Sequence, residues 1–289
     1  THHFLVNAMR IAHVVSTYPP YHGGMGNVAQ GMAQGLRERG HHCDVLTPDY
    51  GGKVALEAGV IRLRPWFSSR NAAFVPSLAS RLKAGKYDLV HLHYPFLGGA
   101  ESVFWFKLRN PNTRLIITYH MDTFGRGWRR AVLSLYRRLF MRRMMRQADV
   151  VTCSSLDYAK HSALAALPDL HLVELAFGVV DRFQPQDKTP AVADKLTLLF
   201  VGGLDQAHYF KGLSVLFASL VALDRIERSK LRLNIVGDGD LRPIYEKSVK
   251  DLGLQEQVFF SGKLGASALV RAYQQADMTV LPSIDQSEA

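Results

Sequence analysis

The chain has 289 residues, 47% of them hydrophobic, and a formal net charge of +10. This length and apolar content predict two α/β domains with sizeable cores. The two cysteines, Cys43 and Cys153, lie in or beside apolar strand-like runs and not in paired motifs, which excludes a disulfide scaffold or a zinc site and indicates a reducing compartment. No apolar run is long enough to cross a bilayer. We therefore expect a cytoplasmic protein.

Residues 1–8 resemble the remnant of a purification tag, so we place the start of the native chain at Met9. The positive charge belongs to the first part of the chain. Up to Arg182 there are 23 Lys/Arg against 12 Asp/Glu, and from residue 183 onward there are 12 against 13. An anionic partner is therefore expected at the first part.

The chain begins with a predicted strand over 10–16, a loop containing Gly23 and Gly24, and a helix over 27–39 that Gly40 would end. The first helical residue is an asparagine, a good N-cap. Glycines at a helix N-terminus let a ligand approach the backbone closely.

The same loop matches part of a dinucleotide fingerprint, Gly24-x-Gly26-x-x-Ala29, with Asp44 near the distance expected for a ribose contact. Two prolines separate these glycines from the strand, and Asp44 begins its strand where the fingerprint needs it at the end. The match is therefore weak evidence for a nicotinamide cofactor.

Further strands are predicted over 42–47, 60–63, 88–94, 115–118 and 148–154. Alternation places His91 and His93 on one face of the fourth strand, near its carboxyl end. Without a third ligand nearby we prefer a polar lining to a metal site by about four to one. His120 follows the next strand at the same edge, where open parallel sheets bind ligands.

The segment 126–146 contains eight arginines and no acidic residue. Its apolar residues form a helical stripe, namely Val132, Leu135, Tyr136, Leu139 and Phe140. Arg143 falls on the continuation of this stripe, so the stripe must drift or the helix bend there. We prefer, at about three to two, a helix packed by its apolar stripe with a solvated basic face over one that binds anionic lipid. No nucleic-acid module surrounds the segment, so nucleic acid is not an expected partner.

A segment rich in Pro, Gln and Asp predicts a linker over 184–195, between a first domain over 9–183 and a second over 196–289. The second domain alternates strands and helices. Its strands are predicted over 196–201, 231–236, 258–261 and 278–281, and its helices from 212, over 241–252 and over 266–276. Because no closing helix follows the fourth strand, we expect the chain to end within this domain.

The second domain begins with an apolar run that stops at Gly202 and Gly203, and a helix starts just beyond Lys211. Backbone N–H groups, the positive helix end and an ammonium group would converge there on an anion. On this stretch alone, an ordinary surface lysine is equally well supported.

Several of these motifs, in this order, resemble the retaining glycosyltransferases of family 4, which have the GT-B architecture of two Rossmann-like domains facing each other across a cleft. The matching pieces are the Gly23-Gly24 loop, His120, Phe200-Val-Gly202 with Lys211-Gly212, Val236-Gly-Asp-Gly239, Phe260-Ser-Gly262 and Leu281-Pro-Ser283. Glu288-Ala289 resembles the opening of the family's E-x7-E motif, which implies an incomplete second domain.

The resemblance implies roles for particular residues. The catalytic residues would be His120 and Glu288. The donor diphosphate would lie against Lys211, Gly202, Gly203, Gly23 and Gly24. The nucleoside would lie between loops with Gly237, Asp238, Gly262 and Lys263. The acceptor side would include His93 and Tyr94. An anionic or membrane surface would bind Arg130, Arg137, Arg138 and Arg142.

The sequence departs from the family pattern in two places. Gly203 stands where members commonly carry an arginine, so part of the diphosphate clamp is missing unless His208 or a group of the N-terminal domain replaces it. The second glutamate of the E-x7-E motif would lie beyond Ala289, which implies weak donor binding and low activity for this chain. Asp238-Gly-Asp240 follows a second-domain strand, so we do not interpret it as a metal-binding D-x-D motif. We expect no metal and no cofactor.

The resemblance implies transfer of a sugar from a UDP- or GDP-linked donor to an acceptor hydroxyl, with retained configuration. The acceptor would be a glycan, lipid-linked or of the cell envelope, handled by a cytoplasmic enzyme peripheral to the inner membrane face. The alternatives are a nicotinamide-dependent oxidoreductase and a basic peripheral membrane-binding protein without activity.

Overall fold

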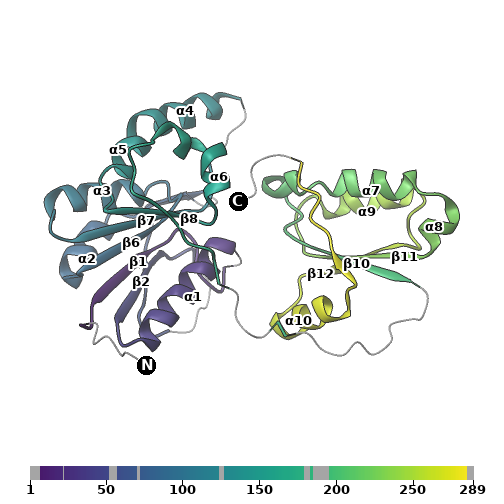
Figure 1. The fold of residues 1–289 in the computed structure, drawn as a ribbon, viewed down its shortest axis with the longest axis horizontal. Coiled ribbons are helices and arrows are strands. Elements are labelled where there is room, and N and C mark those ends of the chain that lie inside the picture. The colour runs from purple at the N-terminus through teal and green to yellow at the C-terminus, as the bar shows by residue number, and fades with distance from the viewer. Residues whose placement is uncertain are drawn as a thin grey trace. The chain divides into compact units, whose positions relative to one another are not determined.

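The computed structural model describes residues 7–21, 23–51, 57–69, 72–123, 127–178, 183–184 and 195–284. The chain divides into two compact units, with the boundary after Gly178. Most of the linker expected over 184–195 lies outside the described residues. Each unit is an alternation of strands and helices around its own parallel sheet (Figure 1).

The sheet of the first unit has seven parallel strands in the order β3-β2-β1-β6-β7-β8-β9. The strands are β1 (Arg10–Val14), β2 (His42–Pro48), β3 (Val60–Leu63), β6 (Leu89–Tyr94), β7 (Arg114–Tyr119), β8 (Val150–Cys153) and β9 (Leu172–Glu174). The order reverses between β1 and β6. In open parallel sheets ligands bind at the carboxyl edge beside such a reversal.

Helices cover both faces of this sheet (Figure 1). They are α1 (Gly24–Glu38), α2 (Leu78–Gly85), α3 (Ala100–Arg109), α4 (Trp128–Tyr136), the π-helical η1 (Arg137–Met141), α5 (Arg142–Met145), α6 (Leu156–His161) and the 3-10 turn η2 (Ala163–Ala166). A short hairpin, β4 (Phe67–Ser69) and β5 (Ala72–Phe74), stands apart from the sheet. α1 packs on one face through Met25, Ala29 and Ala33, whereas α2, α3 and α5 pack on the other.

The sheet of the second unit has four parallel strands in the order β12-β11-β10-β13. The strands are β10 (Leu196–Val201), β11 (Leu231–Val236), β12 (Val258–Gly262) and β13 (Met278–Thr279). The helices are the 3-10 helix η3 (Gln206–Lys211), α7 (Leu213–Ala222), α8 (Arg225–Ser229), α9 (Arg242–Asp251) and α10 (Ala266–Gln275). α7 and α9 pack on one face of this sheet through Phe217 and Tyr245, and α10 packs on the other face through Ala272 (Figure 1).

The expected strands are all present, and the structure corrects the start of α1. This helix begins at Gly24 with Gly23 as its N-cap, so Asn27 lies inside the helix and donates its backbone N–H to the Gly23 carbonyl at 3.2 Å. Gly40 follows the helix with φ +86°, as a glycine that ends a helix does. Cys43 and Cys153 are buried free thiols, as expected.

The arginine-rich segment 126–146 differs from the expectation in how its apolar stripe is used. Tyr136 and Phe140 pack against the core, but Val132, Leu135 and Leu139 are 53%, 57% and 47% exposed. The expected irregularity is present as the π-helical turn η1. Among the described residues no helix combines the length and the apolar character that a membrane span requires.

Candidate functional site

Three loops meet at the carboxyl edge of the second sheet. The Gly202 N–H donates to the Val236 carbonyl at 3.0 Å, and the Gly237 N–H donates to the Gly262 carbonyl at 2.9 Å. Gly237 has φ +145°, and a Cβ there would lie 1.8 Å from the Gly202 oxygen. Only glycine permits the backbone at residue 237 to come this close to Gly202. The loops that the resemblance assigned to the diphosphate and to the nucleoside therefore lie side by side.

Lys211 lies at the junction of η3 and α7, next to the first glycine loop. It ends the 3-10 helix η3, and Gly212 then turns the chain into α7 with φ +72°. A Cβ on Gly202 would lie 2.8 Å from the Lys211 Cδ, so the lysine stem passes over Gly202. The ammonium lies 5.9 Å from the centroid of the Phe210 ring. Lys211 therefore lies next to both the first glycine loop and the start of α7.

His208 covers the position where family members carry an arginine. A Cβ on Gly203 would lie 2.7 Å from the His208 Nδ1. The same nitrogen lies 2.9 and 3.0 Å from the two carboxylate oxygens of Asp205. Gly203 thus leaves room for an imidazole that a neighbouring carboxylate orients.

The remaining nucleoside-loop residues differ in how they are held. The Asp238 carboxylate accepts the Gly239 N–H at 2.9 Å and lies 3.5 Å from the Arg242 Nη1. Lys263 directly follows β12 and is exposed. Glu288 lies outside the described residues, so its expected role stays a prediction.

In the first unit, the two glycines in the first turn of α1 have different surroundings. A Cβ on Gly24 would meet nothing within 4 Å, whereas one on Gly26 would lie 2.6 Å from the Thr17 carbonyl oxygen. Gly23 has no side chain with which to cap the helix, so the N–H groups of the first turn lack a side-chain cap from this residue. Asp44 accepts the Tyr87 hydroxyl at 2.7 Å in the amino half of β2, away from the edge where a ribose contact would be needed.

Four histidines lie on the sheet of the first unit between β1 and the end of β7. His13 and His91 are register partners on β1 and β6, His93 lies two residues further along β6, and His120 follows β7. Their exposed fractions are 0%, 6%, 0% and 6%. The rings of His91 and His93 stack with centroids 4.6 Å apart, which confirms that the two share a face.

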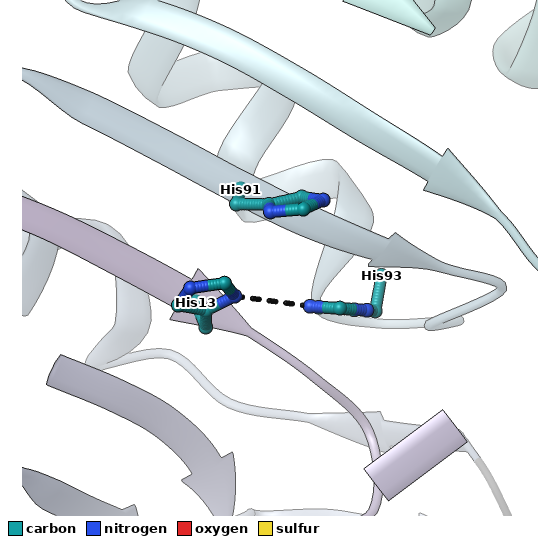
Figure 2. Close-up of side chains that lie close together, drawn as sticks. All are labelled: His13, His91 and His93. Carbon is teal, nitrogen blue, oxygen red and sulfur yellow. Dashed lines mark hydrogen bonds between the residues drawn. The ribbon is translucent and has the colours of Figure 1, made fainter. Parts of the chain in front are cut away.

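Hydrogen bonds join three of these histidines in one chain, whereas His91 bonds to threonines. His13 Nδ1 lies 3.1 Å from His93 Nε2, and His93 Nδ1 lies 3.0 Å from His120 Nε2. The first of these bonds is drawn in Figure 2. His91 Nε2 instead bonds Thr118 Oγ1 at 2.6 Å, which in turn bonds Thr152 Oγ1 at 2.8 Å.

Burial keeps these imidazoles neutral. It lowers the pKa of His91 to about 4 and, with a smaller effect of His91 itself, lowers the pKa of His120 to about 3. The pKa values of His13 and His93 are also well below the usual value, chiefly because of burial and secondarily because of neighbouring histidines. All four rings are therefore uncharged at neutral pH.

The sequence missed His13, which is the third histidine near His91 and His93. Ring nitrogens of these three residues all lie within 4.8 Å of one another (Figure 2), a spacing that a metal ion could bridge after small side-chain movements. The pairing of β1 with β6 brings His13 there, and a single sequence does not state which strands pair. No other group of His, Cys, Asp or Glu in the described part of the chain has this spacing.

His93 and Tyr94 were expected on the acceptor side, and both side chains are fully buried at 0% exposure. Tyr94 points to the opposite sheet face, where its ring stacks on Tyr119 with centroids 5.4 Å apart. The structure therefore argues against a direct acceptor contact for either residue. His93 is connected to the sheet edge through its bond to His120.

The four arginines of the expected anionic surface do not act alike. Arg137 donates from Nη1 to the Thr123 carbonyl and is half-buried, so it belongs to the interior of the unit. Arg130 and Arg138 are exposed, and Arg142 is half-buried. Beside them lies the exposed stripe of α4 and η1, which we define as Trp128, Val132, Leu135 and Leu139.

The structure also exposes aromatic residues that the sequence analysis did not select. Trp66, Phe67 and Phe74 at the β4–β5 hairpin are 81%, 66% and 47% exposed. Trp66 lines a hollow of about 550 Å³ together with Arg64, Pro65, Pro76 and Ser77. Exposed aromatic rings of this kind suit partly apolar ligands. A tryptophan isolated between short strands carries no periodic signal that could have marked it.

Comparison with known proteins bears on the whole chain. The family described as "Glycosyltransferase Family 4" matches residues 22–168, and "Glycosyl transferases group 1" matches residues 181–289. The O-antigen chain mannosyltransferase C of Escherichia coli is 30% identical over 97% of this chain and 74% of its own length. This chain belongs to glycosyltransferase family 4. It is an enzyme of that family, and the nicotinamide-dependent alternative is not favoured.

Other relatives and solved structures agree with this assignment. The phosphatidyl-myo-inositol mannosyltransferase of Mycobacterium tuberculosis is 26% identical over 90% of this chain and 68% of its own length. Sucrose-phosphate synthase from Thermosynechococcus elongatus has a TM-score of 0.72 at 19% identity, over 97% of this chain and 77% of that one. Anabaena Alr3699/HepE in complex with UDP and glucose has a TM-score of 0.70 at 15% identity, over 95% and 74%. The fold class is that of the GT-B glycosyltransferases, as expected.

Proposed function

We propose that this glycosyltransferase moves mannose from GDP-mannose to a hydroxyl group of a cell-envelope glycan, with retained configuration. The donor proposal is supported by relatives named as mannosyltransferases and by one named as GDP-mannose-dependent, from Corynebacterium glutamicum, which is 25% identical over 96% of this chain and 68% of its own length. The main structural support for a nucleotide donor is that Lys211 lies against the glycine loop after β10, which contacts the loops after β11 and β12.

In this proposal the second unit binds the nucleotide. The Lys211 ammonium and the N–H groups near Gly202 would neutralise the diphosphate, since cations and helix N-termini both attract phosphate. The loops at Gly237 and Gly262 would lie against the nucleoside. Glu288 would lie near the donor sugar, and His208 would stand in for the arginine absent at Gly203.

The reaction breaks the bond between mannose C1 and the phosphate oxygen and forms one between C1 and the acceptor oxygen on the same face of the sugar. The departing phosphate accepts the acceptor's proton, and GDP leaves. Such a reaction needs stabilisation of the leaving group more than a strong base. The neutral imidazole of His120 would serve as a hydrogen-bonding partner of the sugar or acceptor, a role that a buried and uncharged ring can fill.

A membrane-associated acceptor is the second part of the proposal. It is supported by the stripe of Trp128, Val132, Leu135 and Leu139, which leaves large apolar side chains exposed beside Arg130 and Arg138. A helix with exposed apolar residues next to cations suits the surface of an anionic bilayer. We propose that this surface holds the enzyme at a membrane that carries its acceptor.

Calorimetric titration with GDP, UDP and NAD tests the donor proposal. We expect saturable binding of GDP and a weakening of about tenfold to a hundredfold in Lys211→Ala, because a hydrogen bond to a charged group contributes about 1.5–3 kcal/mol. Lys250→Ala, an exposed lysine in the last turn of α9, is the matched control and should bind as the unchanged chain does. UDP binding in place of GDP, or equal binding by both lysine variants, would refute the assigned donor site.

A further inference from the structure

Three imidazoles form a continuous chain inside the first unit. His13 lies on β1, His93 on β6 and His120 just after β7, and the two hydrogen bonds that join them measure 3.1 and 3.0 Å. Figure 2 shows the rings of His13 and His93 facing each other along the first of these bonds. A neutral imidazole carries one N–H donor and one lone pair. Fixing the proton on any one ring therefore fixes it on the other two.

Only two proton arrangements satisfy both bonds. In the first, every ring carries its proton on Nδ1, so that His13 donates to His93 and His93 donates to His120. In the second, every ring carries its proton on Nε2 and the bonds run in the opposite direction. The two arrangements differ at the ends of the chain, which are His13 Nε2 and His120 Nδ1.

The buried end of the chain favours the first arrangement. His13 Nε2 is fully buried and has no hydrogen-bond partner among the described residues. In the first arrangement this atom is a bare lone pair, whereas in the second it is an N–H group without an acceptor. Among buried backbone groups an N–H without an acceptor is rarer than an under-satisfied acceptor, and the same preference applied to this ring nitrogen favours the bare lone pair. The other end, on His120, lies at the carboxyl edge of the sheet.

We propose that His13 and His93 are positioning residues that hold His120 in its Nδ1–H tautomer, so that His120 presents a hydrogen-bond donor at the carboxyl edge of the first sheet. A free histidine side chain in water favours the opposite tautomer, so the chain selects the less common form. An N–H at this position can donate to a hydroxyl or phosphate oxygen, whereas a lone pair could only accept from a hydroxyl and would repel an unprotonated phosphate oxygen. This consequence rests on the proposed function, in which His120 meets the sugar or acceptor.

A metal ion is the competing explanation for the cluster. His13, His91 and His93 have ring nitrogens within 4.8 Å, and Zn²⁺ binds imidazole nitrogens at about 2.0–2.1 Å. The nitrogens of His13 and His93 already bond each other, and in the described part of the chain no carboxylate or thiolate joins the three histidines as a further ligand. The hydrogen-bonded chain accounts for more of these contacts, and the metal is an outcome that the experiment can detect.

The test is a ¹⁵N NMR measurement on the full chain labelled at histidine, since the ¹⁵N shift of each ring nitrogen shows whether it carries the proton. We expect His13, His93 and His120 all to carry the proton on Nδ1 near pH 7. A His120 with its proton on Nε2 would overturn the proposal without any variant. The measurement needs no donor and no turnover, so its result is independent of the titration that tests the proposed function.

Variants test whether the chain is the cause. His93→Phe removes both bonds, and we expect the His120 proton to move largely to Nε2 or to exchange between the two nitrogens. His93→Gln keeps an amide that can donate to His120 and should retain Nδ1–H. His91→Phe is the matched control, since His91 is also buried and stacks on His93 but bonds Thr118. A His120 signal that is the same in His93→Phe as in His91→Phe would overturn the proposal.

His13→Leu breaks the chain one ring earlier and serves if His93→Phe does not fold. It should make the position of the proton on His93 and His120 less defined. Addition of ZnCl₂ completes the test. Stoichiometric binding that shifts the His13, His91 and His93 signals together, and that His13→Leu abolishes, would assign the cluster to a metal and overturn the hydrogen-bonded chain.

Discussion

Gly24 and Gly26 lie two residues apart at the start of α1, yet a side chain would meet different surroundings at each. A methyl group on Gly24 would enter open space, whereas one on Gly26 would lie 2.6 Å from the Thr17 carbonyl oxygen. Gly26 thus lets the helix pack closely on the end of its preceding loop. Gly24 has no such packing constraint, which leaves approach of a ligand as its expected task.

This difference gives a prediction with its own control. Gly26→Ala should lose about 1–3 kcal/mol of unfolding free energy through overpacking. Gly24→Ala should keep or gain about 0.5–1 kcal/mol, because alanine is the better helix residue, and should weaken GDP-mannose binding or turnover by crowding the ligand. Urea unfolding and donor titration measure the two effects. Unchanged donor binding and turnover in Gly24→Ala would remove Gly24 from the site.

The helical segment from α4 through η1 to α5 changes its winding at Arg137–Met141. A continuous α-helix would have placed Arg143 on the same side as Tyr136 and Phe140, which pack against the core. The wider π turn rotates the residues that follow it, so that Met141, Met144 and Met145 are buried while Arg143 is exposed. The same change leaves the stripe of Trp128, Val132, Leu135 and Leu139 outside the core.

The exposed stripe of α4 and η1 should determine membrane binding. The chain should bind vesicles containing phosphatidylglycerol more tightly than vesicles of phosphatidylcholine alone, and added salt should weaken this binding. Leu135→Ser with Leu139→Ser should weaken it at least about tenfold, since burying a leucine contributes about 1.5–3 kcal/mol. Vesicle sedimentation measures the binding.

A matched control for the vesicle experiment is Leu156→Ser with Leu175→Ser, two leucines of the first unit that are each 40% exposed outside the stripe. These changes should leave vesicle binding intact. If both double variants bind alike, the stripe is not a membrane contact. Binding that ignores lipid charge would argue against the basic residues beside it.

At the scale of the whole molecule, the two units should respond differently to acid. All four buried histidines lie in the first unit, and the described part of the second unit contains none. Each folded-state pKa lies below the ordinary value of about 6.5, so the unfolded chain binds more protons in acid. The stabilisation by neutral histidines is therefore complete above pH 6.5 and falls as the pH drops towards the folded-state values, about 4 for His91 and about 3 for His120.

The expected result is selective loss of stability in the first unit between pH 6.5 and pH 5, by about 2 kcal/mol per histidine at pH 5. The three tryptophans, Trp66, Trp105 and Trp128, all lie in the first unit, so their fluorescence follows it alone while calorimetry follows both units. His91→Phe should reduce the pH dependence by about 1.4 kcal/mol per pH unit. Equal acid sensitivity of both units would contradict the prediction.

The elements that the sequence predicted well are those with strong local signals. Apolar runs bounded by glycine or polar residues identified every strand of both sheets except β9, because buried parallel strands are apolar on both faces. Short elements with weak periodicity, such as the β4–β5 hairpin, were not identified. The start of α1 was wrong because Asn27 has the chemistry of a cap, whereas the helix begins earlier with an uncapped glycine.

In the candidate site, too, the residues with local sequence signals were predicted and those that depend on long-range contacts were not. The sequence determined Lys211 and the glycine loops of the second unit, because the helix start and the strand ends are local features and parallel strands bring their carboxyl ends to one edge. Only the tertiary structure decided that His13 joins His93 and His120, that Tyr94 faces the opposite side, and that Arg137 bonds the interior while Leu135 faces solvent. Strand order and the winding of a helix depend on contacts between residues far apart in the chain, and a single sequence does not record those contacts.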